Sequence, residues 1–148
     1  MQIRSALTSD VPRLVSLVRR YWEFEGIGGF DALHIELLLQ RLTAQQTLGE
    51  VWVAADESAL SGYLVVVYVL SLEHQGLMAE IDEFFVLPEA RSQGLGSQLL
   101  RAAEARLKQR GCVRLQLQLA AKNAASRLFY ERRGYHSRAG YSLFDKAL

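Results

Sequence analysis

Residues 91–97 combine glycines with polar side chains in a spacing that suits binding of a phosphate group. They are Arg91, Ser92, Gln93, Gly94, Leu95, Gly96 and Ser97. An apolar stretch, 81–87, precedes them, and a segment with helical spacing follows. Glycines let a backbone approach a ligand closely, and a helix N-terminus offers unpaired N–H groups with partial positive charge. The segment is therefore predicted to hold phosphate.

Three glycine-rich patterns can be compared with this segment. The phosphate loop of NTPases needs a lysine after its last glycine, but Ser97 follows Gly96. The dinucleotide fingerprint needs a third glycine or alanine, but position 99 is leucine. The pattern Gln/Arg-x-x-Gly-x-Gly/Ala, which binds the pyrophosphate of coenzyme A, is filled by Arg91, Gly94 and Gly96. A strand-to-helix turn without a ligand remains an alternative for the hexapeptide alone.

A second motif lies at 123–135, which reads NAASRLFYERRGY. Asn123 is a good helix N-cap and Gly134 a good residue just past a helix end, so the span predicts a short capped helix. Before it, alternating leucines and polar residues predict a strand over 113–119.

With both motifs in this order, the chain resembles the GNAT superfamily of acyl-CoA-dependent N-acyltransferases. The second motif matches through Asn123, Ser126, Phe129, Tyr130, Gly134 and Tyr135. The resemblance implies acetyl transfer from acetyl-CoA to a primary amine, by direct attack and without a covalent enzyme intermediate. It also implies that the backbone of Phe85 and Val86 pairs with the pantetheine arm, and that Asn123 and Ser126 contact the cofactor. Capping alone is the other role open to Asn123.

The chemistry of this transfer needs an amine that has lost its proton, because an alkylammonium with a pKa of about 10 is not a nucleophile. It also needs a donor to the forming oxyanion and a proton for the leaving thiolate. The resemblance assigns the last role to Tyr130, for which packing in the core is the alternative.

The candidate bases are Glu80 and Asp82, which the resemblance places on the strand that supplies a carboxylate. Strand alternation puts them on one face and Glu83 on the other. A solvated pair that only attracts a cation is the alternative.

Charge is divided unevenly along the chain. Residues 1–90 hold 5 basic and 13 acidic side chains, and residues 91–148 hold 12 and 3. The acidic half favours a cationic acceptor, a small molecule or a peptide amine, unless folding intermixes both halves. The resemblance places the acceptor site near Tyr21, Trp22 and Glu25, which could equally be a helix end. Short similarities to diamine and polyamine acetyltransferases lie at 81–86 and 123–134.

Composition limits the remaining functions. The 148 residues suit a single N-acetyltransferase domain over 1–148, and the net charge of +1 favours neither nucleic acid nor a membrane surface. A single cysteine and no apolar leader predict a cytoplasmic protein. The scattered histidines predict no metal site. The sequence leaves a homodimer open.

The expected fold is mixed α/β (α+β), as in GNAT proteins, with six to seven strands and about four helices. The strands are expected near 2–6, 50–55, 60–70, 77–87, 113–119 and 141–146. The helices are expected to begin near 11, 32, 95 and 124. Two other functions stay open: an acyl-CoA-binding module without catalysis, and a nucleotide-binding regulatory domain.

Overall fold

The computed structural model describes residues 1–148, and the chain divides into two compact units, 1–117 and 118–148. Residues 1–117 form a five-stranded mixed sheet with three helices, and residues 118–148 contain one helix. The prediction of one domain over the whole chain stays a prediction.

The sheet has the strand order β1-β2-β3-β4-β5. Its strands are β1 (Gln2–Ser5), β2 (Gly49–Ala55), β3 (Leu60–Ser71), β4 (Gly76–Val86) and β5 (Arg114–Leu117). Neighbours are antiparallel except β4 and β5, which are parallel and are joined through a helix. Strands β3 and β4 form the longest pairing, so β4 is supported by β3 along nearly its whole length.

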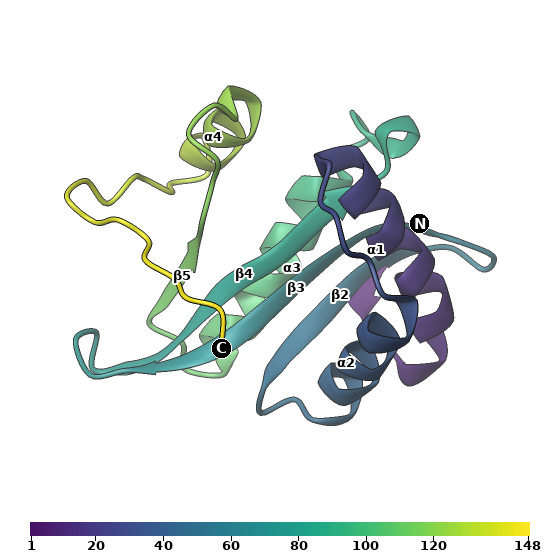
Figure 1. Ribbon diagram of the computed structural model, residues 1–148, viewed down its shortest axis with the longest axis horizontal. Helices are drawn as coiled ribbons and strands as arrows, with labels where there is room; N and C mark the ends of the chain where they lie inside the picture. The colour runs from purple at the N-terminus through teal and green to yellow at the C-terminus, as the bar shows by residue number, and fades with distance from the viewer. The chain divides into compact units, whose positions relative to one another are not determined.

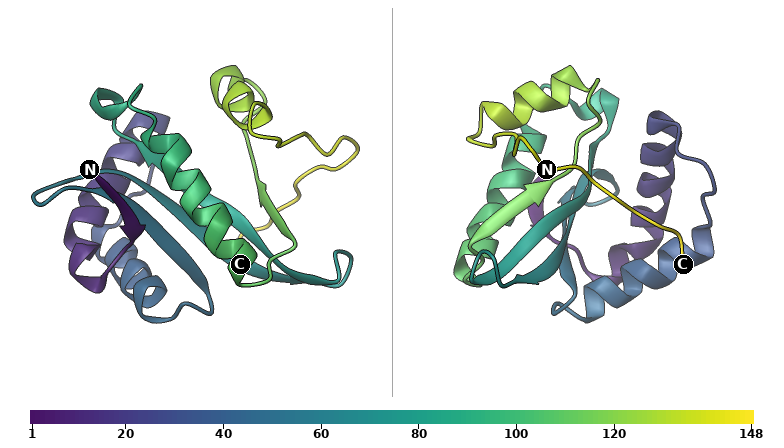
Figure 2. Two further views of the ribbon diagram at one scale, coloured as in Figure 1. Left: turned by 180° about the vertical axis from the view of Figure 1, so that it is seen from behind. Right: turned by 60° about the vertical axis from the view of Figure 1, so that its left-hand side comes forward.

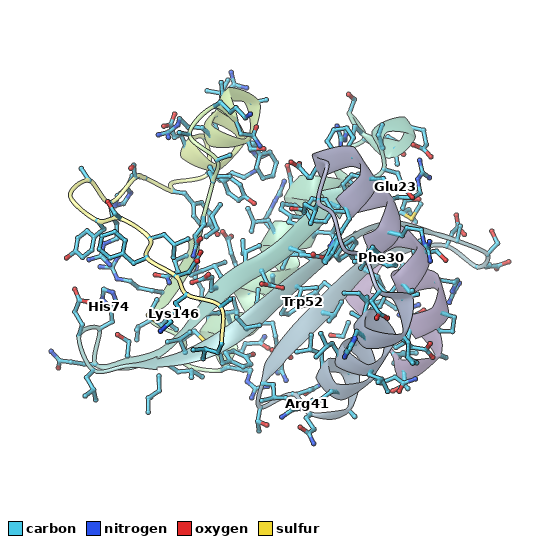
Figure 3. The ribbon with its side chains drawn as sticks, viewed as in Figure 1. Glu23, Phe30, Arg41, Trp52, His74 and Lys146 are labelled. Atoms are coloured by element: carbon cyan, nitrogen blue, oxygen red, sulfur yellow. The ribbon has the colours of Figure 1, made fainter.

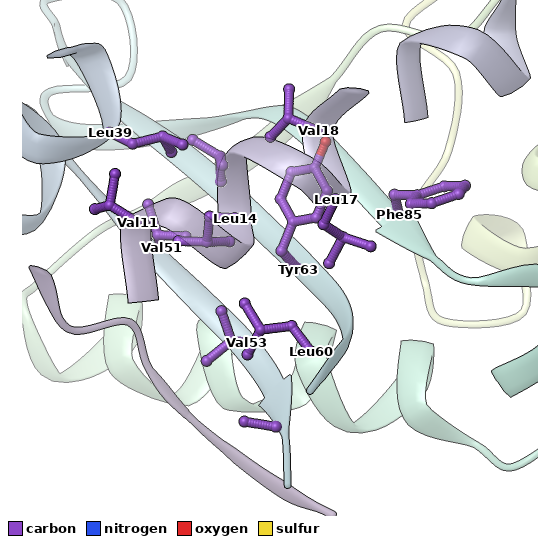
Figure 4. Packing of buried hydrophobic residues seen from close by; sticks show 12 residues of the cluster. Val11, Leu14, Leu17, Val18, Leu39, Val51, Val53, Leu60, Tyr63 and Phe85 are labelled. Carbon is purple, nitrogen blue, oxygen red and sulfur yellow. The ribbon is translucent and has the colours of Figure 1, made fainter. Parts of the chain in front are cut away.

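The helices of this unit cover both faces of the sheet (Figures 1 and 2). Helices α1 (Val11–Glu25) and α2 (Ala32–Ala44) lie on one face, and α3 (Leu95–Gln109) lies on the other. Figure 4 shows side chains of α1 and α2 packed against Val53, Tyr63 and Phe85 of the sheet. Their burial is the main stabilising contribution on this face.

Helix α1 begins differently from the sequence pattern. Thr8 and Ser9, whose side chains are typical of a helix N-cap, belong to a 3-10 turn, Thr8–Asp10, that runs directly into the helix. Asp10 is fully buried and accepts hydrogen bonds from Arg4 and Arg13 at 2.6 and 2.7 Å. These contacts lower the pKa of Asp10 to about 2, so β1 and the start of α1 are joined by a charged carboxylate.

The second unit contains α4 (Ala124–Glu131). The strand expected near 141–146 is absent, and the sheet has five strands rather than the expected six to seven. Tyr141, Leu143 and Phe144 are all exposed, so this stretch lacks the buried face that a strand needs. No helix in either unit has the length and apolar composition required to span a bilayer.

Candidate active site

A β-bulge in β4 determines which carboxylates share a face of the sheet. Val65 pairs with Glu83 and Val66 pairs with Ile81, so Asp82 is an extra residue in the strand. Cross-strand partners project from the same face. Glu83 therefore shares the face of Val65, which is part of the core beneath α1 and α2.

Glu80 also lies on this face, because it pairs with Val67, two residues beyond Val65. Asp82 is close enough to Tyr21 and Tyr63 for its charge to raise the pKa of both phenols. Glu80 and Glu83 thus lie on the α1 side, and Asp82 lies in the bulge between them. The expectation that Glu83 points to the opposite face is wrong, since simple alternation does not count the extra residue.

Glu83 is held by two neutral donors. The Tyr63 hydroxyl donates to one carboxylate oxygen at 2.7 Å, and the Trp22 indole N–H donates to the other at 2.8 Å. Burial raises the pKa of Glu83, while the two hydrogen bonds oppose that rise. No salt bridge neutralises Glu83 or Asp82, so the negative charge of this face is available to a ligand.

The two carboxylates predicted to act as bases differ in their surroundings. Glu80 accepts a hydrogen bond from Gln116 of β5 at 2.7 Å. Asp82 is more exposed, yet neighbouring protein atoms displace enough water to raise its pKa, and the charge of Glu80 adds to the rise. A carboxyl with a raised pKa is a better proton acceptor near neutral pH.

The C-terminal end of α1 supplies aromatic groups to the same region. Tyr21 lies edge-on to Tyr63 and is tilted against Phe85, with ring centroids 6.4 and 5.5 Å apart. Burial, together with the charges of Glu25 and the β4 acids, raises the pKa of Tyr21 to about 12. Trp22 contacts Phe30, labelled in Figure 3, which lies in the connection to α2. We call the α1 side of the sheet at Glu80, Asp82 and Glu83 the acidic face. Of the predicted acceptor residues, Tyr21 and Trp22 therefore lie at the acidic face.

The glycine-rich segment forms the entry to α3. Ser92 and Gly94 have left-handed backbones, with φ of 66° and 74°, and the helix begins at Leu95. The first backbone hydrogen bond of the helix runs from Gln98 N–H to Gly94 C=O, at 3.0 Å. The amides of Leu95, Gly96 and Ser97 precede it in the first turn, which contains no acidic side chain. Such a turn can accept an anion.

The Arg91 side chain contacts β4 and α1. Its Nε donates to the Val86 carbonyl at 3.0 Å. Its guanidinium lies over the Phe24 ring at 4.7 Å and the Phe85 ring at 5.7 Å. Arg91 thus links the loop to β4 and to α1.

The second unit holds the remaining predicted residues. Asn123 caps α4, because its side-chain oxygen accepts from the Ser126 N–H at 3.2 Å. Tyr130 is buried, with ring contacts to Phe129 and Tyr135 at 5.2 and 5.4 Å. Capping and packing are thus observed for Asn123 and Tyr130, and neither contact excludes a further role.

A sequence model of the acetyltransferase (GNAT) family matches residues 12–135. The chain belongs to the GNAT family. Members of this family use acetyl-CoA as co-substrate, and the chain is an acyl-CoA-dependent acetyltransferase.

Two relatives agree with this assignment. The chain is 29% identical over 145 residues to an uncharacterized N-acetyltransferase, YhfO, of Bacillus subtilis, covering 95% of this chain and 93% of that protein. It is 39% identical over 77 residues to an aminoalkylphosphonate N-acetyltransferase of Salmonella typhimurium, covering 52% and 49% of the two chains.

Solved structures show the GNAT fold. An integron cassette protein from the mobile metagenome of Cole Harbour Salt Marsh matches with a TM-score of 0.86 and 28% identity, covering 99% of this chain and 90% of that one. An aminoglycoside acetyltransferase from an uncultured soil metagenomic sample matches with a TM-score of 0.81 and 21% identity, covering 99% and 95%. The second likeness concerns the fold alone.

Sequence reasoning missed Glu83 and Tyr63 as members of the acidic face. The only signal was the run of three acids within 80–83 on an otherwise apolar strand. The register that brings them together depends on backbone pairing with β3.

Proposed function

We propose that this GNAT protein transfers the acetyl group of acetyl-CoA to a primary amine of a cationic small molecule. The observation that carries the proposal is that Glu80 and Glu83 share one sheet face beside α1, with Asp82 in the bulge between them. The contacts of Glu83 are neutral donors. A positive acceptor is therefore attracted to this face and held there.

The cofactor is assigned to the segment from β4 to α3. The first-turn amides of α3 bind the pyrophosphate, and the left-handed backbone at Ser92 and Gly94 directs the chain into that turn. The backbone of Phe85 and Val86, at the end of β4, pairs with the pantetheine arm as an added strand would. The family resemblance adds Asn123 and Ser126 as further cofactor contacts.

The reaction needs one group that accepts a proton and one group that donates a proton. Glu80 or Asp82 takes a proton from the bound ammonium, directly or through water. The free amine nitrogen then attacks the thioester carbonyl and loses its second proton to solvent, and collapse of the tetrahedral intermediate breaks the C–S bond. Tyr130 donates a proton to the departing thiolate and is reprotonated from solvent. The products are the N-acetyl amine and the CoA thiol, with one proton released.

Direct attack is favoured over a covalent acyl-enzyme because the chain's single cysteine is a poor nucleophile. Burial raises the pKa of the Cys112 thiol above its usual value. The thiolate, which is the reactive form, is therefore disfavoured near neutral pH.

The acceptor can be tested by following release of the CoA thiol with a matched panel. We expect 1,4-diaminobutane to be acetylated faster than butylamine, and an aminoalkylphosphonate to be the poorest acceptor, because its anionic group meets the acidic face. Thiol release dependent on the phosphonate, with none on the diamine, would contradict a cationic acceptor. Acetyl-CoA binding without turnover on any amine would instead favour a non-catalytic binding module.

A further inference from the structure

Two contacts join the C-terminal half of α1 to the segment that leads into the cofactor loop. The first is a paired salt bridge between Arg20 and Glu89, with distances of 2.9 and 3.3 Å. The second is the guanidinium of Arg91, which lies 4.7 Å from the centroid of the Phe24 ring. Phe24 is about half exposed, so the stacked arginine covers part of a ring that would otherwise face water.

Besides Phe24 of α1, Arg91 contacts two residues at the end of β4. It holds the Val86 carbonyl through Nε, and it approaches the ring of Phe85, which Tyr21 contacts from α1. Phe85 is buried and belongs to the core cluster, so it provides a fixed support. A planar guanidinium can stack on two rings and donate from its edge, which a lysine ammonium cannot do.

We infer that the Arg91 side chain is a positioning residue for the acceptor side, although its motif belongs to the cofactor. The guanidinium fixes the end of α1 over β4, and so sets the position of Tyr21 and Trp22 beside the acidic face. The backbone of the loop, rather than this side chain, holds the phosphate. This inference rests on the proposed function, because it presumes that the acceptor binds at the α1 end.

The experiment compares Arg91→Met with Arg91→Lys in the full-length protein. Affinity for acetyl-CoA and, in the presence of CoA, for 1,4-diaminobutane is measured by calorimetry, and the acceptor KM and kcat by thiol release. Both variants should raise the diamine Kd and KM about 2- to 5-fold, as expected for loss of an exposed stacking contact. The acetyl-CoA Kd should change less than 2-fold.

A double-mutant cycle with Phe24→Leu makes the test specific. In the Phe24→Leu background, Arg91→Met should change the diamine Kd little further, because the stacking contact between the two side chains is already lost. Arg19→Met provides the matched control, since it removes a similar stacking contact in α1, to Phe30 at 4.8 Å, that does not touch the loop. Its effect should add to that of Arg91→Met.

Two results would overturn the inference. One is a raised acetyl-CoA Kd that Arg91→Lys restores, with no change for the diamine, since it would make the guanidinium a phosphate ligand. The other is additivity between Arg91 and Phe24. Failure of the wild type to transfer acetyl to any amine would instead count against the proposed function, and the calorimetric cycle would still decide the role of Arg91.

Discussion

The properties of each carboxylate in the acidic face depend on the hydrogen bonds that it accepts. Glu83 retains its carboxylate in a partly buried position because Tyr63 and Trp22 each donate to it. Asp82 has no such donor, and burial together with the charge of Glu80 raises its pKa. We therefore propose different roles for these two neighbouring acids: Glu83 keeps a negative charge in place, and Asp82 exchanges a proton.

Removing a hydrogen-bond donor to Glu83 should change the pH dependence of acetylation. Tyr63→Phe removes a hydrogen bond that lowers the pKa of Glu83, so that pKa should rise further above its ordinary value. The carboxylate is charged only above its pKa, so the attraction for a cationic amine should be lost at a higher pH in the variant. The ratio of variant to wild-type kcat/KM, measured with one amine from pH 5 to pH 8, cancels ionisation of the amine.

In both variants the ratio of variant to wild-type kcat/KM should fall as the pH is lowered. Trp22→Phe should have this effect because it removes the indole N–H that donates to Glu83. A ratio that stays constant across the range would show that ionisation of Glu83 does not influence acceptor binding.

Tyr130 tests the chemical step. Tyr130→Phe keeps the ring and its contacts with Phe129 and Tyr135 but removes the hydroxyl. We expect kcat to fall about 10²- to 10⁴-fold, the usual contribution of a general acid, with acetyl-CoA affinity and melting temperature nearly unchanged. Tyr135→Phe is the matched control in the same unit. Near-normal kcat when acyl transfer limits the rate would leave Tyr130 with a packing role.

Among the structural elements, the strands and helices of residues 1–117 agree well with the sequence pattern. Helix α3 was predictable from leucines at helical spacing, and β4 from its apolar run. The bulge at Asp82 was not, because it arises from the register between β3 and β4. The last strand was expected wrongly, since apolar side chains at 141–144 indicate a strand only if something buries them.

The first turn of α3 provides a test at this scale. Gly96→Val places a branched side chain where the pyrophosphate is proposed to bind, and the acetyl-CoA Kd should rise about 10-fold or more. Gly96→Ala is the control, because the binding pattern accepts alanine there, and its effect should be smaller. Calorimetry on both variants, with melting curves to check folding, gives the comparison. An unchanged Kd in folded Gly96→Val would remove this turn from the cofactor site.

Across the whole molecule, the uneven charge of the sequence has a local counterpart. Of the 13 acidic side chains in residues 1–90, Glu80 and Glu83 share one face of β4, and Asp82 lies in the bulge between them. The basic half includes Arg91, beside the loop assigned to the phosphates. The family and the cofactor class were thus predictable from motifs, while the acceptor depends on which charges the fold brings together.

The most direct test of a charge-selected acceptor is the ratio of kcat/KM for 1,4-diaminobutane to that for butylamine. We predict that Glu80→Gln combined with Asp82→Asn lowers this ratio about 5-fold, as expected for two solvent-screened charge contacts worth about 0.5 kcal/mol each. Both amines should lose kcat through the missing base, so only the ratio reports selection. A ratio equal to that of the wild type, in a folded and active variant, would contradict selection of the acceptor by this face.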